Sequence, residues 1–134
     1  MNRIPPVLLV LILVLTGCST QQTAKQEETK VTYTQIDQET AKEMMTRDDG
    51  HVIVDVRRQD EYDAGHIPGA ILIPNESIGT SQPEELSDLE QIILVYCRSG
   101  NRSKQAAEKL AAMGYTNIYE FGGINTWTGE IVKE

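Results

Sequence analysis

The sequence predicts an α/β domain with a mostly parallel sheet, and three observations lead to this fold class. Residues 51–56 and 91–96 are nearly continuous apolar runs, which are typical of central parallel strands covered on both faces. Strand patterns alternate with helix patterns along the chain, which is the order that builds a parallel sheet. A chain of 134 residues has room for one such domain.

The first half of the domain begins with β-prone residues and an amphipathic helix. Asp37 is a suitable N-cap, and helical spacing places Ala41, Met44 and Met45 on the buried face. Gly and Pro residues at 65–70 mark a turn. The elements expected here are strands at 32–36, 51–56 and 71–73, a helix at 38–47 and a short helix at 60–64.

The second half follows a polar stretch at residues 75–90. Its first strand, at 91–96, delivers the chain directly to Cys97, and Gly114 is a suitable C-terminal stop for the helix that comes next. We expect a helix at 103–113 that buries Ala106, Ala107, Leu110 and Met113, a strand at 118–121, and a short helical end carrying Ile124 and Trp127.

The most informative segment reads Cys-Arg-Ser-Gly-Asn-Arg-Ser at residues 97–103. Backbone N–H groups at a helix start, together with the guanidinium groups of Arg98 and Arg102, lower the pKa of a thiol. These polar neighbours cannot line an apolar pocket, so we expect Cys97 to be a partly exposed, reactive cysteine. Gly100 and Asn101 tolerate left-handed backbone angles, which lets the loop curl into a nest of N–H groups that binds anions.

The spacing after Cys97 separates two kinds of chemistry. Phosphatase loops place five residues between the cysteine and an arginine, so that the loop surrounds a tetrahedral phosphate. Here four residues separate Cys97 from Arg102, and the position that would hold the phosphatase arginine is Ser103. A loop shorter by one residue encloses a smaller volume, which suits a sulfur atom better than a phosphoryl group.

The first 30 residues have the pattern of an export signal and a tether. Residues 1–17 are predicted to be a cleaved signal peptide, with an apolar run at 7–15 that is too short to span a bilayer comfortably. The sequence Leu-Thr-Gly-Cys at 15–18 resembles the lipobox of bacterial lipoproteins, which implies that Cys18 is diacylated. Residues 18–30 are then a flexible linker, and the folded domain is 31–134. We therefore expect an exported protein, lipid-anchored on the periplasmic or extracellular face of a bacterial membrane.

The charge and the histidines exclude several other functions. A net charge of −8 argues against nucleic acid as a partner, whereas Arg98 and Arg102 supply local positive charge for small anions. The cysteines and histidines lack metal-ligand spacing, so neither a metal nor a cofactor is expected. His51 and His66 are assigned structural or surface roles, and Trp127 is expected in the core or in a pocket wall.

Several ordered motifs resemble those of single-domain rhodaneses, a family of sulfurtransferases, from about residue 32 to residue 127. The resemblance implies a five-stranded, mostly parallel sheet flanked by helices on both faces, with the cysteine loop as the active site. It also implies a persulfide on Cys97 as the reaction intermediate. The motifs are the loop at 97–103, Asp-Val-Arg at 55–57, Glu61 with Tyr62, Gly-His-Ile-Pro-Gly-Ala at 65–70, Gly-Gly at 122–123, and Trp127.

The resemblance further implies a role for each site residue. The Cys97 thiolate attacks the outer sulfur of thiosulfate or of a persulfide donor, and an unidentified thiol or protein accepts that sulfur. Arg98 and Arg102 attract the anionic donor, and in similar proteins the region of Asp55, Arg57 and Glu61 is structural. The N–H groups that stabilise the thiolate and persulfide belong to Ser99, Gly100, Asn101, Arg102 and Ser103.

Two alternatives remain open from the sequence. One is a non-catalytic or carrier module that delivers persulfide from Cys97 to a single protein partner. The other is phosphatase or arsenate-reductase chemistry in a related loop, which the spacing between Cys97 and Arg102 disfavours.

Overall fold

The structure is a computed structural model that describes Gly17 and residues 32–133. Most of the predicted signal peptide at 1–17, the predicted lipid-bearing Cys18 and the linker at 18–30 therefore lie outside the described residues. Within the described part of the chain, no helix has the length and hydropathy of a membrane span.

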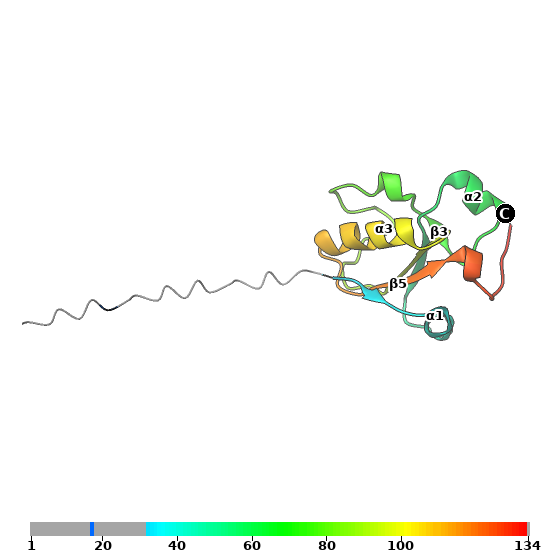
Figure 1. Cartoon of the computed structure of the whole chain (residues 1–134), viewed down its shortest axis with the longest axis horizontal. Coiled ribbons are helices and arrows are strands. Elements are labelled where there is room, and N and C mark those ends of the chain that lie inside the picture. Colours follow the sequence, from blue (N-terminus) through cyan, green and yellow to red (C-terminus); the bar gives the residue numbers. More distant parts are fainter. Residues whose placement is uncertain (1–16, 18–31, 134) are drawn as a thin grey trace, which may run out of the picture.

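Five parallel strands form one sheet in the order β1-β5-β4-β2-β3, and helices lie on both faces of it (Figure 1). This arrangement confirms the predicted fold class. The strands are β1 (Thr34–Gln35), β2 (Val52–Asp55), β3 (Ile71–Leu72), β4 (Ile93–Cys97) and β5 (Ile118–Gly123). The helices are α1 (Gln38–Met45), α2 (Gln59–Ala64) and α3 (Asn101–Ala112), with short 3₁₀ helices η1 (Asn75–Ser77) and η2 (Ile124–Thr126).

Two hydrophobic cores lie on opposite faces of the sheet, and the central strand β4 supplies both. Successive side chains of a strand point to opposite faces. Leu94 and Tyr96 pack with α1 on one face, whereas Val95 and Cys97 pack with α3 on the other. All five residues of β4 are buried, as the apolar run predicts. The alternation places the Cys97 side chain on the α3 face, at the carboxyl end of the central strand.

Helix boundaries differ from the prediction in ways that have local causes. Helix α3 begins at Asn101, two residues early, because the chain turns sharply at Gly100 and becomes helical at once. Helix α1 is capped by the Asp37 side chain, as expected, but it ends at Met45. Met45 and Met113 are half-buried rather than buried, since both stand at the C-terminal end of their helix.

Candidate active site

The cysteine loop runs from the end of β4 into α3 and curls around the sulfur atom of Cys97. Gly100 has φ of +105°, a left-handed conformation that favours glycine, and its N–H donates to the Cys97 Sγ at 3.0 Å. The end of β5 and the start of η2 lie against the same loop, because Cys97 pairs with Gly123 and the Asn125 N–H of η2 donates to the Arg98 carbonyl at 3.1 Å. A Cβ at Gly123 would collide with that carbonyl oxygen, so glycine is required for this close approach.

The sulfur of Cys97 is buried and surrounded by hydrogen-bond donors. Burial by itself raises the pKa of the thiol, but the hydrogen bonds of the loop outweigh it, among them those from the N–H groups of Ser103, Gly100 and Ser99. The net result is a pKa of Cys97 below its usual value. The residue is only 1% exposed, so the expectation of a partly exposed cysteine is wrong. Cys97 is buried because the register of β4 points its side chain into the core between the sheet and α3.

The two arginines of the loop have different environments. Arg98 is exposed, whereas Arg102 makes a bidentate ion pair with Glu61 on α2, at 2.7 and 2.9 Å. Hydrogen bonds from Arg102 lower the pKa of Glu61 to about 2, although partial burial opposes the shift. The pKa of Arg102 is raised by Glu61 and also by the charge of Cys97, which places this guanidinium within electrostatic reach of the sulfur. Glu61 therefore holds the loop arginine that the sequence assigns to anion binding.

This ion pair makes a pH-dependent contribution to stability. The folded-state pKa of Glu61, about 2, lies below its usual value of 4.5, so the contribution is present above pH 4.5 and is lost as the pH falls toward 2. We expect Glu61→Gln to unfold at lower urea concentration than the wild type at pH 7, with the gap closing between pH 4.5 and pH 2. Urea unfolding of both proteins at several pH values measures this difference in midpoint. A gap that is the same at every pH would contradict the assignment.

A buried ion pair supports the carboxyl ends of β2 and β4. Asp55, which is fully buried, accepts hydrogen bonds from the Arg57 guanidinium at 2.7 to 3.1 Å and from the Tyr96 hydroxyl at 2.8 Å. Burial and the neighbouring Asp55 raise the pKa of Tyr96. The same cluster reaches the 65–70 turn, because Arg57 donates to the Gly65 carbonyl and Tyr96 accepts from Ile67 N–H. Asp55 and Arg57 therefore connect two strands to the turn that follows α2.

One residue of the site has no counterpart in the sequence prediction. Glu120 on β5 is only 2% exposed, and its Oε1 accepts from the Ser103 hydroxyl at 2.6 Å and from Gly122 N–H at 2.8 Å. The Ser103 oxygen lies 3.4 Å from the Cys97 sulfur. The prediction used the N–H of Ser103 and not its hydroxyl. A carboxylate within an otherwise apolar strand was the available signal for Glu120.

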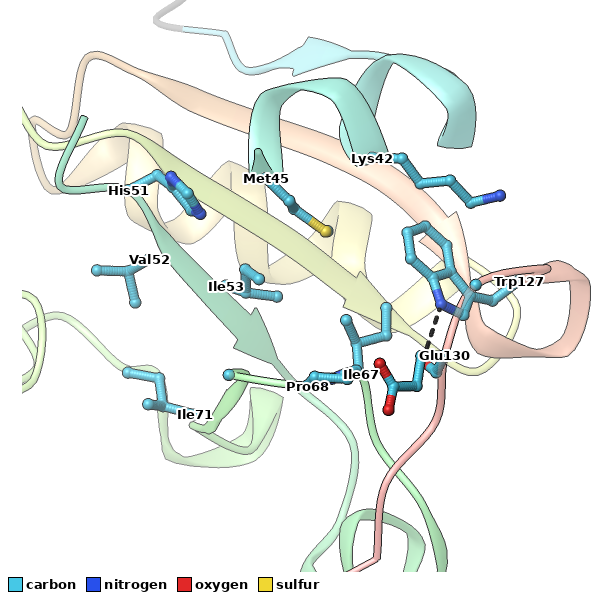
Figure 2. Close-up of a pocket in the computed structure, with 12 residues that line it drawn as sticks. Lys42, Met45, His51, Val52, Ile53, Ile67, Pro68, Ile71, Trp127 and Glu130 are labelled. Carbon is cyan, nitrogen blue, oxygen red and sulfur yellow. Dashed lines mark hydrogen bonds between the residues drawn. The ribbon is translucent and has the colours of Figure 1, made fainter. Parts of the chain in front are cut away.

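Two cavities lie near these elements. A cavity of about 590 Å³ lies against α1 and the turn near Ile67, and its wall includes Trp127, as expected (Figure 2). His51 also lines this cavity, and its Nδ1 lies 2.6 Å from Asp49 Oδ1. A second cavity, of about 480 Å³, is lined by Gly100 of the cysteine loop and by Glu120. Only the second cavity therefore borders the cysteine loop.

The structure also shows where the remaining residues named in the sequence analysis lie. Asn101 is the exposed first residue of α3, and Ser99 is exposed at the loop. His66 is buried and stacks on Tyr62 with ring centroids 3.7 Å apart. Within the described part of the chain, no three acidic, histidine or cysteine side chains converge as metal ligands would.

Comparison with known proteins agrees with the architecture. The pattern that defines the Rhodanese-like domain matches residues 37–130. The chain belongs to this family. It is 38% identical over 82 residues to the thiosulfate sulfurtransferase GlpE of Pseudomonas fluorescens, an alignment that covers 60% of this chain and 73% of that protein. It is also 33% identical over 93 residues to the adenylyltransferase and sulfurtransferase UBA4 of Meyerozyma guilliermondii, covering 63% of this chain but only 22% of that longer protein.

Solved rhodanese structures have the same fold. A rhodanese with anions from E. coli is 33% identical, with a TM-score of 0.58, and the match covers 63% of this chain and 99% of that one. A rhodanese-like domain protein from Staphylococcus aureus is 30% identical, with a TM-score of 0.64, and the match covers 75% and 98% of the two chains. The rhodanese resemblance predicted from the motifs is therefore confirmed.

Proposed function

We propose that this rhodanese-family protein is a sulfurtransferase that moves a sulfane sulfur from thiosulfate or a persulfide donor to a thiophilic acceptor. The observation that carries the proposal is the loop around Cys97, which lowers the pKa of the thiol by hydrogen bonds. A thiolate near neutral pH is the nucleophile that sulfur transfer needs. The similarity to a protein named thiosulfate sulfurtransferase supports the same substrate class.

The proposed reaction has two steps and needs no general base in the first. The Cys97 thiolate attacks the outer sulfur of thiosulfate, a new S–S bond forms, and the old S–S bond breaks with its electron pair leaving on sulfite. Cys97 then carries a persulfide anion, and the total charge is unchanged. In the second step a nucleophilic acceptor, such as cyanide or a thiolate, takes the outer sulfur and returns Cys97 to the thiolate.

Electrostatics favour an anionic donor at this loop. The N–H groups around Cys97 stabilise the thiolate and would stabilise the persulfide that replaces it. Arg98 is exposed and free to meet an incoming anion at the surface, while Arg102, which Glu61 holds, interacts electrostatically with the sulfur. The exposed charge of Arg98 thus offsets part of the repulsion that a chain of net charge −8 exerts on thiosulfate.

We further propose that the mature protein is exported and anchored through lipid on Cys18, after removal of residues 1–17. The basis is the order of a basic start, an apolar run at 7–15 and a lipobox-like sequence at 15–18. Globomycin, which blocks lipoprotein signal cleavage, should cause accumulation of the uncleaved precursor. A precursor processed normally in its presence, and unaffected by Cys18→Ala, would contradict the anchor.

Turnover with alternative substrates tests the assigned chemistry. The protein is expected to form thiocyanate from thiosulfate and cyanide and to leave an aryl phosphate and arsenate unchanged. A carrier module would instead accept sulfur once and release it slowly to every small acceptor. Hydrolysis of the aryl phosphate that depends on Cys97, without thiocyanate formation, would overturn the sulfurtransferase proposal.

A further inference from the structure

The buried carboxylate of Glu120 is joined to the reactive sulfur through the Ser103 hydroxyl, and the sulfur chemistry described above does not use it. Burying a carboxylate costs free energy unless hydrogen bonds compensate. The described donors that contact Glu120 are neutral: the Ser103 hydroxyl at 2.6 Å, Gly122 N–H at 2.8 Å and the Gln35 amide at 3.4 Å. A negative charge held in this way keeps most of its effect on neighbouring groups, because solvent screens buried charges weakly.

The Ser103 hydroxyl connects this carboxylate to the sulfur. A hydroxyl has one hydrogen, and three oxygen acceptors compete for it: Glu120 Oε1 at 2.6 Å, the Gly100 carbonyl at 2.9 Å and the Gly122 carbonyl at 3.4 Å. The Cys97 thiol donates to the same Ser103 oxygen at 3.4 Å. The short bond to a carboxylate is the strongest of the three. An ionised Glu120 therefore draws the hydrogen toward itself, and the Ser103 oxygen then faces the sulfur with a lone pair.

Both effects oppose a negative charge on the sulfur of Cys97. The lone pair of Ser103 and the like charge of Glu120 destabilise the bare thiolate, which the N–H groups of the loop stabilise. In the persulfide the negative charge sits on the outer sulfur, one S–S bond of about 2 Å farther from Glu120, so the repulsion is weaker. Transfer of sulfur onto Cys97 thus moves charge away from the buried carboxylate.

We propose that Glu120 is a positioning residue that acts through Ser103 to make the Cys97 sulfur a stronger base and to favour the persulfide over the bare thiolate. The part of the proposal that concerns the persulfide rests on the proposed sulfurtransferase function. The part that concerns the basicity of the sulfur does not. A more basic thiolate is also a better nucleophile, which helps the attack on the donor.

Other charged and titratable groups also lie around Glu120. A substitution of Glu120 leaves their charges unchanged. Helix α3 presents Lys104, which lines the same cavity, and the exposed Glu108. The pKa of Tyr33, ahead of β1, is raised by burial and by both Glu108 and Glu120. Asp37, at the start of α1, borders the cavity, and Arg102 interacts electrostatically with Cys97.

The matched variants are Glu120→Gln and Glu108→Gln. Glutamine keeps an oxygen that accepts from Ser103 and Gly122, so Glu120→Gln removes the charge and leaves both hydrogen bonds possible. Glu108→Gln removes the same charge from an exposed position on α3. Glu120→Asp keeps the charge but withdraws it from Ser103, and it serves as the milder variant should glutamine prevent folding.

The decisive readout is the pH titration of the Cys97 thiolate by its ultraviolet absorbance, with each protein read against its own Cys97→Ser version. We expect the midpoint in Glu120→Gln to fall by about one pH unit, the midpoint in Glu120→Asp to fall by less, and the midpoint in Glu108→Gln to stay in place. An unchanged or higher midpoint in a folded Glu120 variant would overturn the proposal.

A second readout concerns the loaded state. At a fixed ratio of thiosulfate to sulfite, intact mass should show a smaller persulfide fraction for Glu120→Gln than for the wild type, and an equal or larger fraction would overturn the bias toward persulfide. The two failures are distinguishable. If no protein forms a persulfide, the sulfurtransferase function fails, while the titration still decides the role of Glu120.

Discussion

Replacing Cys97 with serine is expected to lower the rate of thiocyanate formation from thiosulfate and cyanide by about a thousandfold or more, to the uncatalysed background. A serine hydroxyl stays protonated near neutral pH and forms no stable bond to sulfane sulfur, whereas the N–H groups of the loop lower the pKa of the thiol. Thiocyanate formation under steady-state conditions measures the effect.

The control for Cys97→Ser is a measurement of its thermal stability, which shows whether the variant still folds. Serine is close in size to cysteine, and Cys97 lies in the core beside Ala106 and Ala107, so only a small volume is lost. The thermal unfolding midpoint should therefore change little beside the loss of activity. Ser99→Ala, which alters an exposed side chain of the same loop and keeps its N–H, should retain most of the turnover. Turnover that survives in folded Cys97→Ser would refute the assigned nucleophile.

Replacing Asp55 with alanine is expected to give the largest loss of stability. The substitution leaves the Arg57 guanidinium, which is 5% exposed, and the Tyr96 hydroxyl, which is fully buried, without their carboxylate partner. Removing one member of a buried ion pair leaves an uncompensated charge, and the free energy of unfolding falls by about 3 to 5 kcal/mol. Chemical denaturation at pH 7 measures it.

The matched control for Asp55→Ala is Asp60→Ala on α2. Asp60 also pairs with an arginine, Arg58, but both side chains are largely exposed, so solvent screens the pair. The denaturation midpoint of Asp60→Ala should stay near that of the wild type. Equal midpoints for the two variants would show that burial of the Asp55–Arg57 pair does not increase its contribution to stability.

The fold follows from the sequence because the central strands and the main helices each carry a strong local signal. The apolar runs at 51–56 and 91–96 become β2 and β4, and the alanine-rich face of the predicted 103–113 helix packs against β4 as α3. Strong agreement between strand pattern and burial is expected for a sheet covered on both faces. The short edge strands β1 and β3 depend more on their pairing than on their own residues.

The chemistry of the loop follows from the sequence only in part. The segment at 97–103 marks a reactive cysteine, because its residue types and its place before a helix are local features. Burial of Cys97 is different, since it depends on which face of the sheet the last residue of β4 meets. The sequence pattern alone did not determine that register at the strand's end.

The contacts that tune the site join residues far apart in the chain. Glu61 meets Arg102 across 41 positions, and Glu120 meets Ser103 across 17. Each pair forms because α2 and β5 are brought beside the start of α3 by the strand order of the sheet. No local pattern predicts such partners, so the motif containing Glu61 indicated a structural role without naming the arginine it holds.

The measurement that tests the central claim most directly is the intact mass of the protein after incubation with thiosulfate, followed by peptide mapping. The proposal predicts one added sulfur atom, located on Cys97, which disappears on addition of cyanide as thiocyanate is released. A mass that does not change with thiosulfate, or a sulfur adduct that forms equally in Cys97→Ser, would contradict it.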